Sequence, residues 1–233
     1  MALLLAFETA TRHCAVALSE GGRLSHYRLE DSERFSHAEK LNVFIETVLQ
    51  EADKKMSDIA AVAVGTGPGS YTGLRIGLSA AKGLCFALDI PLIGLSTLDV
   101  LIHELRASGL TGQSDDVLHP MVDARRMEVF TKKAIGAELC ITAARPLILE
   151  DAWCDSLEPG HRHLVFGDGA DKAGELWSRH AQVLHVRGIR PSAKGLAAAA
   201  YNAFQRKDFA DLAYLVPDYG KEANVTQPAK RAQ

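Results

Sequence analysis

The chain has 233 residues, of which 47% are hydrophobic and 24% charged, and its formal net charge is −3. These proportions are typical of a globular protein with one large or two small domains around an apolar core. The net charge argues against a chain that binds nucleic acid by itself, since such binding depends on clustered lysine and arginine. The four cysteines form no Cys-x-x-Cys pair, which disfavours a zinc ribbon or a redox motif.

The N-terminal run MALLLAFETA is too short to span a membrane and has no basic start, so it does not match a signal peptide. No other stretch of the sequence is both long and apolar enough to span. We therefore expect a cytoplasmic protein with no membrane association.

The first fifty residues predict three strands and a helix. Apolar runs at 3–7 and 14–18, followed by a third strand at about 24–29, predict a three-strand meander. Ser36 and Glu39 stand at the spacing of a capping box and predict a helix start. The helix extends to about residue 52 and has an apolar stripe that includes Leu41, Phe44, Ile45 and Val48.

The next segment alternates strands and helices. A buried strand at 59–64 leads into a glycine-rich loop at 65–73 and a helix at about 71–88. Another strand at 90–95 and another helix at 97–106 follow. This order predicts a mixed sheet with helices on its faces.

A polar stretch at 107–117 predicts a boundary between two units. Beyond it we predict, in order, a strand-turn-strand with its bend at 123–126, a strand at 163–166, a helix to about residue 180, a strand at 183–186 and a helix at 192–206. We thus expect an N-terminal subdomain at 1–106, a C-terminal subdomain at 107–219 and a disordered tail at 220–233.

The loop GTGPGSYTG lies between a strand and a helix, where backbone N–H groups can receive an anion. The phosphate-loop pattern G-x-x-x-x-G-K-[ST] and the dinucleotide pattern G-x-G-x-x-G are both absent. On local chemistry alone, a tight structural turn and an anion cradle are equally compatible with this loop.

The helix at 71–88 is apolar around most of its circumference, so it needs cover on more than one side. Gly73, Gly77 and Ala81 are spaced by four and form a strip of small residues that another helix could approach closely. Internal glycines cost roughly 1 kcal/mol each in helix propensity, so some contact should compensate for them. A helix of the same chain or a partner protein could supply that cover.

The motifs FETAT at 7–11, SHAEKL at 36–41, GTGPGSYTGLRIGLSAAKGL at 65–84 and GLSTLDVL at 94–101 closely resemble the TsaB (YeaZ-type) family. The second half matches more loosely, through MVDARRMEVF and FGDGA. The resemblance implies an α/β protein with the actin-like ATPase fold (sugar kinase/Hsp70/actin, ASKHA), built from two α/β subdomains with mixed sheets. It also implies a role in making N6-threonylcarbamoyladenosine (t6A) at position 37 of tRNAs that read codons beginning with A.

The resemblance further implies partners for the chain. The family is a glycoprotease-like, non-catalytic paralogue of TsaD; it binds TsaD, acts with TsaE, forms a homodimer when TsaD is absent, and meets tRNA only indirectly. We expect the helices at about 36–52 and 71–88 to form the interface. The residues expected there are Leu41, Phe44, Ile45, Val48, Gly73, Leu74, Gly77, Leu78 and Ala81.

Relatives of the TsaD type carry an H-x-x-x-H motif whose histidines hold a metal, but Thr97 and Leu101 stand at those positions here. Neither side chain binds a divalent metal well, so we predict no metal site and no catalytic residue. Asp168 interrupts the Gly-Gly turn that contacts adenosine in related enzymes, so we expect ATP or ADP to bind weakly, or only at the TsaD interface. Possible vestigial phosphate-facing residues are Glu8, Thr9, Thr11, Gly67 and Gly69.

Three functions stay open at this point. The first is the non-catalytic partner of TsaD that supports threonylcarbamoyl transfer. The second is a metal-dependent glycoprotease-like peptidase, against which the missing H-x-x-x-H argues. The third is an actin-fold small-molecule kinase or ATPase, against which the interrupted Gly-Gly turn argues.

Overall fold

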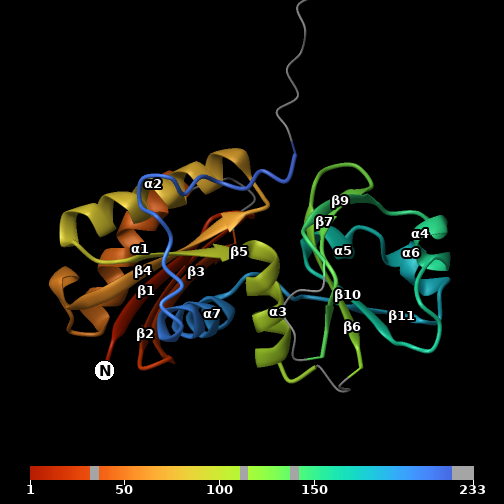
Figure 1. The fold of residues 1–233 in the computed structure, drawn as a ribbon, viewed down its shortest axis with the longest axis horizontal. Coiled ribbons are helices and arrows are strands. Elements are labelled where there is room, and N and C mark those ends of the chain that lie inside the picture. Colours follow the sequence, from red (N-terminus) through yellow and green to blue (C-terminus); the bar gives the residue numbers. More distant parts are fainter. Residues whose placement is uncertain (32–36, 111–114, 137–141, 222–233) are drawn as a thin grey trace, which may run out of the picture.

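The computed structural model describes residues 1–31, 37–110, 115–136 and 142–221. Two β-sheets lie side by side, and helix α3 (Thr97–Ala107) stands between them (Figure 1). Ser36, the predicted helix cap, and nearly all of the predicted tail lie outside the described residues.

The first sheet has five strands in the order β3-β2-β1-β4-β5. Antiparallel pairing joins β1 to β2 and β2 to β3, which confirms the predicted meander, while β1, β4 and β5 run parallel. The strands are β1 (Leu3–Glu8), β2 (His13–Glu20), β3 (Arg23–Asp31), β4 (Ile59–Gly67) and β5 (Leu92–Ser96).

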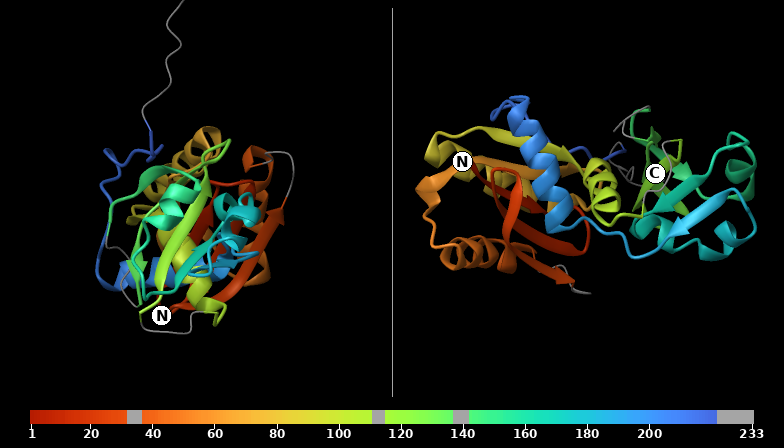
Figure 2. Two further views of the ribbon diagram at one scale, coloured as in Figure 1. Left: turned by 90° about the vertical axis from the view of Figure 1, so that its right-hand side faces the viewer. Right: turned by 90° about the horizontal axis from the view of Figure 1, so that it is seen from below.

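Helices cover both faces of this sheet because successive strand residues point to opposite sides. Leu5 and Phe7 of β1 pack in the cluster shared with α1 (His37–Glu51) and α2 (Tyr71–Leu88), and a 3-10 turn, η1 (Met56–Asp58), follows α1. Leu4 and Ala6 pack with α7 (Ala193–Gln205) on the opposite face. Figure 2 shows α7 running across that face.

The second sheet has the order β11-β10-β6-β7-β9, with β8 paired to β6. Its strands are β6 (Val117–Asp123), β7 (Glu128–Thr131), β8 (Ala134–Ile135), β9 (Arg145–Ile148), β10 (His163–Phe166) and β11 (Val183–Val186). Helix α3 (Thr97–Ala107) covers one face through Leu98, Leu101 and Ile102. The other face is covered by α4 (Asp151–Asp155), α5 (Asp168–Asp171) and α6 (Gly174–Ser178).

The chain returns to the first sheet after the second one is complete. Helix α7 packs against β1, β2, β3 and α3. The N–H of Ala210 then donates to the carbonyl of Leu92 in β5 at 2.8 Å. This placement differs from the predicted C-terminal subdomain at 107–219, because the apolar surface of alanine-rich α7 finds its cover on the first sheet.

Residues 208–221, here called the C-terminal strap, continue from α7 toward α2 (Figure 1). Leu212 and Leu215 of the strap pack on the same core cluster as α1 and α2. Lys221, which the sequence placed in the tail, is ion-paired with Glu128 of β7.

The helix predicted to reach residue 180 is instead the two short helices α5 and α6. Ala173 between them has a non-helical backbone, with φ −115° and ψ 31°. The indole N–H of Trp177 donates to the carbonyl of Ala170 at 2.8 Å and holds the two pieces together. Strand β9 and helix α4 had no predicted counterpart.

Candidate functional site

The turn that follows β1 carries the first of the predicted phosphate-facing residues, Glu8, whose side chain is fully buried. Its Oε1 accepts the backbone N–H groups of Thr9 at 2.9 Å and Ala10 at 2.7 Å. Its Oε2 and the Thr97 hydroxyl are each buried without a hydrogen bond of standard geometry to any described residue. Burial raises the pKa of Glu8 to about 7, against the opposing effect of the two backbone donors and a smaller one of Thr97.

Thr9 joins this turn to the start of α2. Its hydroxyl donates to the carbonyl of Gly73 at 2.8 Å. A Cβ added at Gly73 would lie 2.0 Å from the Thr9 carbonyl oxygen, and one at Gly77 would lie 2.3 Å from Thr9 Oγ1. The small residues at these two positions therefore allow the β1–β2 turn of the same chain to approach α2.

The glycine loop is filled in the same way by the chain's own backbone. The N–H of Ser70 donates to the carbonyl of Ala10 at 2.6 Å. A Cβ at Gly69 would lie 2.3 Å from that same oxygen, and one at Gly67, where φ is +109°, would lie 2.1 Å from the carbonyl oxygen of Asp218.

Residues that the sequence assigned to a vestigial phosphate site are thus closed off. Glu8 and Thr9 are fully buried and Thr11 is 5% exposed. Gly67 and Gly69 lie against backbone carbonyl oxygens, which repel an anion. On the side of these two glycines where a Cβ would stand, the chain's own backbone therefore leaves no room for a phosphate group.

Most residues predicted for the partner interface are buried within the chain. Leu41, Ile45, Val48, Gly73, Leu74, Gly77, Leu78 and Ala81 are buried within the chain, and Phe44 is half-buried. Their apolar stripes face the first sheet and the β1–β2 turn, so these residues form core contacts. The sequence left open whether a helix of the same chain or a partner protein covers the small residues of α2; at Gly73 and Gly77 the cover is Thr9 of the β1–β2 turn.

The solvent side of α2 presents another set of residues. We define the α2 ridge as Thr72, Ser79, Gly83 and Phe86, which are all exposed. Phe86 is 82% exposed, and a Cβ added at Gly83 would meet nothing within 4 Å. Val43 on neighbouring α1 is 53% exposed. Small and apolar residues are therefore exposed to solvent on α1 and α2.

The C-terminal strap lies along one edge of α2. The Arg75 guanidinium stacks 3.9 Å from the centre of the Tyr71 ring, and its Nε donates to the hydroxyl of Tyr219 at 2.9 Å. Lys82 donates to the carbonyl of Ala213 at 3.2 Å. The strap leaves Tyr214 82% exposed beside this edge.

The positions that replace the metal-binding histidines lie at the start of α3. Thr97 and Leu101 are both fully buried. Across the described ranges, no three His, Cys, Asp or Glu side chains gather as a metal-binding group. Asp168 begins α5, where its Oδ1 accepts the N–H of Asp123 at 3.2 Å and burial raises its pKa. None of the helices in the described part of the chain is long and apolar enough to cross a membrane.

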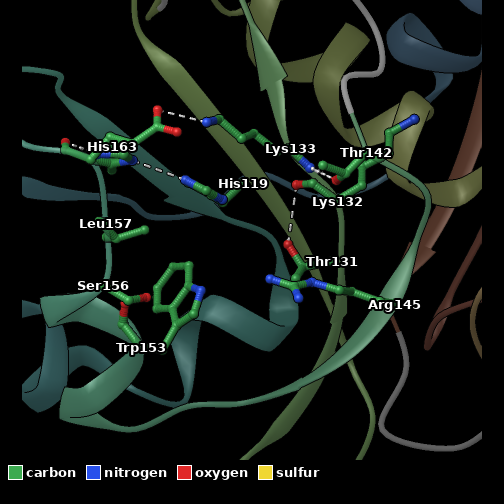
Figure 3. A pocket seen from close by; sticks show the side chains of 11 residues that line it. His119, Thr131, Lys132, Lys133, Thr142, Arg145, Trp153, Ser156, Leu157 and His163 are labelled. Carbon is green, nitrogen blue, oxygen red and sulfur yellow. Dashed lines mark hydrogen bonds and ion pairs between the residues drawn. The ribbon is translucent and has the colours of Figure 1, made fainter.

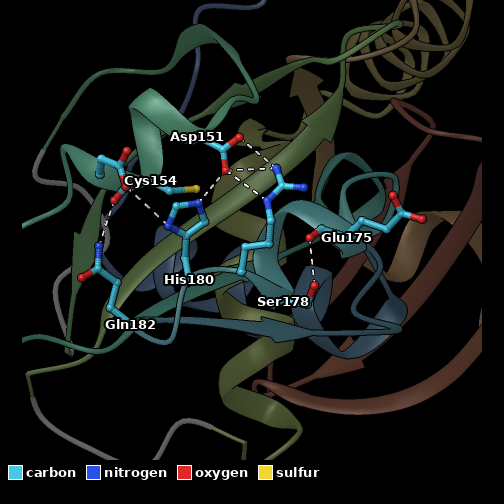
Figure 4. A network of polar contacts seen from close by, with 8 residues as sticks. Asp151, Cys154, Glu175, Ser178, His180 and Gln182 are labelled. Atoms are coloured by element: carbon cyan, nitrogen blue, oxygen red, sulfur yellow. Dashed lines mark hydrogen bonds and ion pairs between the residues drawn. The ribbon is translucent and has the colours of Figure 1, made fainter.

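An ion-pair network in the second subdomain joins α4 to the end of α6 (Figure 4). Asp151 contacts Arg179 and His180, each at 2.9 Å, and Asp155 lies 3.6 Å from His180. Cys154 beside it is fully buried, and burial raises the pKa of its thiol to about 11. Because the thiolate is the nucleophilic form, burial and the raised pKa disfavour this cysteine as a nucleophile.

Sequence similarity identifies the family. The family model described as TsaD, tRNA N6-adenosine threonylcarbamoyltransferase, matches residues 32–231. The TsaB protein of Bacillus subtilis (strain 168) is 31% identical over 194 residues, which cover 79% of each chain. The chain belongs to the TsaB family. TsaB of Escherichia coli (strain K12) is 36% identical over 129 residues, which cover 54% of this chain but only 52% of that relative.

Solved structures agree with this assignment. YeaZ from Pseudomonas aeruginosa superposes with a TM-score of 0.77 at 27% identity and covers 94% of this chain and 100% of that one. More distant neighbours share the fold alone: EutJ from Carboxydothermus hydrogenoformans has a TM-score of 0.53 at 11% identity, and ROK hexokinase from Thermus thermophilus 0.50 at 12%. The predicted actin-like fold and TsaB resemblance are confirmed.

Proposed function

We propose that this TsaB-family chain takes part in forming N6-threonylcarbamoyladenosine on tRNA as a non-catalytic partner of TsaD. The relatives from Bacillus subtilis and Escherichia coli carry the name tRNA threonylcarbamoyladenosine biosynthesis protein TsaB. The observation that supports the non-catalytic part is the closed glycine loop, where the Ser70 N–H donates to the Ala10 carbonyl at 2.6 Å and backbone carbonyl oxygens lie against Gly67 and Gly69. Buried Thr97 and Leu101 offer no metal ligand.

The α2 ridge, together with Val43, is the surface proposed for TsaD. Gly83 and Phe86 give this helix a close-approach point beside a large exposed ring, which suits ridge-into-groove packing with a helix of the partner. The same ridge would pair two copies of this chain when TsaD is absent, and TsaE would join the complex of the two proteins.

Light scattering of the purified chain, alone and mixed with TsaD of the same cell, tests the proposal. We expect a one-to-one heterodimer with TsaD. Gly83→Arg and Phe86→Asp should prevent its formation without unfolding the chain, since a Cβ added at Gly83 meets nothing within 4 Å and Phe86 is 82% exposed. Asn202→Arg, on the exposed side of α7, is the matched control and should bind TsaD normally.

The possible results separate two claims. A chain that ignores TsaD would overturn the partner role. Binding that survives both ridge variants would overturn the α2 ridge alone. Chelator-sensitive proteolysis or sustained ATP turnover by the isolated chain would instead favour the peptidase or the kinase.

A further inference from the structure

A cavity of about 160 Å³ opens beside the second sheet, where α4 faces β6, β7 and β10 (Figure 3). It has nearly the volume of an engineered cavity of about 150 Å³ that holds benzene, so a molecule of similar size fits it. The function proposed above makes no use of this cavity, which lies in the other subdomain from α2.

Two buried imidazoles form the inner wall of the cavity. His119 is 6% exposed and His163 is 1% exposed. His163 Nε2 donates to the carbonyl oxygen of Glu158 at 2.9 Å, since a carbonyl only accepts. In the tautomer that keeps a proton on His163 Nε2 alone, His163 Nδ1 is an acceptor, and His119 Nε2 donates to it at 3.1 Å.

This pattern assigns the remaining nitrogen, His119 Nδ1, as a hydrogen-bond acceptor. No described residue donates to it, and His119 lines the cavity. Burial, and then the positive charges nearby, lowers the pKa of His119 to about 3, so the ring stays uncharged near neutral pH. The inner cavity therefore offers a lone pair and no imidazole N–H donor.

Apolar groups make up the rest of the inner wall. The Trp153 ring meets His119 edge to face, with ring centres 5.3 Å apart, and Leu157 lies beside it (Figure 3). An inorganic anion placed here would point its oxygens at a lone pair and at hydrocarbon. The inner part instead suits the carbon skeleton of a ligand that carries one hydrogen-bond donor.

Three positively charged side chains also line the cavity. Lys132 is ion-paired with Asp99, and Lys133 with Glu158 at 2.8 Å. Arg145 of β9 has no ion-pair partner among the described residues, and its guanidinium extends toward Thr131 and Trp153 (Figure 3). A guanidinium of this kind matches the planar, two-oxygen geometry of a carboxylate.

We propose that this cavity binds a small hydroxy acid. Its carboxylate would lie on the Arg145 guanidinium. Its hydroxyl would donate to His119 Nδ1, and its carbon chain would pack against Trp153 and Leu157. The proposal does not rest on the partnership with TsaD, so either can fail without the other.

The probe for this site is 3-hydroxybutyrate, titrated into the full chain and followed by calorimetry and by the ¹⁵N–¹H signals of the two tryptophan indoles. The Trp153 indole, identified by its loss in Trp153→Phe, should shift on binding. Arg145→Gln should weaken binding about tenfold or more, as expected for loss of a charge-assisted bidentate contact. Arg187→Gln removes the same charge from an exposed position outside the cavity and should leave binding unchanged.

The hydroxyl contact is tested without altering the buried histidines. Butyrate lacks the donor and should bind about five- to tenfold more weakly than 3-hydroxybutyrate; equal binding would overturn the role of His119. A Trp153 signal that does not move at millimolar probe, or that moves equally in Arg145→Gln, would overturn the site. Inorganic phosphate that binds as tightly as the probe would show a simple anion site and overturn the hydroxy-acid assignment.

Discussion

Glu8 combines complete burial with a carboxyl group that has only half of its hydrogen-bonding capacity satisfied. One oxygen accepts two backbone N–H groups, while the other, Oε2, has no hydrogen bond of standard geometry to any described residue. A Cβ at Gly65 of the neighbouring strand β4 would lie 2.2 Å from that oxygen. The carboxyl group therefore fills the space beside Gly65. An ionised carboxylate here lacks the solvation that water would give it, which favours the protonated form.

We therefore predict that Glu8 makes stability fall as pH rises. Its pKa is about 7 in the folded protein, above the ordinary value of 4.5. The stabilisation is complete below pH 4.5 and is lost as pH rises through about 7, because the folded state holds the proton longer. Relative to Glu8→Gln, the wild type should lose about 2–3 kcal/mol of unfolding free energy between pH 5 and pH 8.5.

Urea unfolding of both proteins across that pH range measures this difference. Every other titrating group is common to the two proteins, so its contribution cancels when their unfolding free energies are subtracted. A difference that stays constant with pH would mean that Glu8 is already ionised in the folded protein at pH 5.

At the scale of single elements, helix α2 shows what the sequence could and could not predict. Its bounds matched the prediction because local residues set them: Ser70 accepts the N–H of Gly73 at 3.3 Å, and Asp89 ends the helix in the left-handed conformation at φ 52°. The contact made by its small residues was not predicted from the sequence. Thr9, which packs against them, lies 64 positions away from Gly73. No local pattern reports such a contact.

The remaining misses have related causes. Strand β9 and helix α4 span four and five residues, too short to show a periodic pattern. Helix α7 was found, but its return to the first sheet depends on a shape that exists only after folding. The cavity beside α4 was likewise invisible, since His119, Arg145 and Trp153 come from three separate elements.

Two glycines of α2 should respond in opposite ways to the same substitution. Gly77→Ala places a Cβ 2.3 Å from Thr9 Oγ1 and 3.4 Å from Val64, so overpacking should cost about 1–3 kcal/mol. Gly83→Ala meets nothing within 4 Å and should stabilise by up to about 1 kcal/mol through helix propensity. Urea midpoints of the two variants measure both effects. Shifts in the same direction would contradict the assignment of buried and open faces.

At the scale of the whole molecule, α3 connects the two sheets. Leu98, Leu101 and Ile102 pack on the second sheet, whereas Val100 belongs to the cluster that includes α7 on the first. Polar side chains of α3 also form hydrogen bonds to both subdomains. Arg106 donates to the carbonyl of Gly136, which follows β8, at 2.7 Å, and Glu104 accepts the N–H of Gly195 in α7 at 3.1 Å.

The ion pair between Asp99 of α3 and Lys132 tests how strongly this connection couples the subdomains. The Lys132 side chain is 5% exposed, so Asp99→Ala leaves a nearly buried ammonium without its counter-ion. We expect a loss of about 2–4 kcal/mol, since removing one partner of a buried pair leaves a charge uncompensated. As control, Arg179→Ala removes a pair whose side chains are 56% and 57% exposed and should cost less than about 1 kcal/mol.

The same variant should also separate the unfolding of the two sheets. Both tryptophans, Trp153 and Trp177, lie in the second subdomain, so their fluorescence reports that part, while far-ultraviolet circular dichroism reports the whole chain. In the wild type the two signals should change at one urea concentration, because α3 belongs to both cores. In Asp99→Ala the fluorescence midpoint should fall below the dichroism midpoint, since Lys132 lies directly after β7 of the second sheet. Midpoints that stay coincident would show that the apolar contacts of α3 alone couple the subdomains.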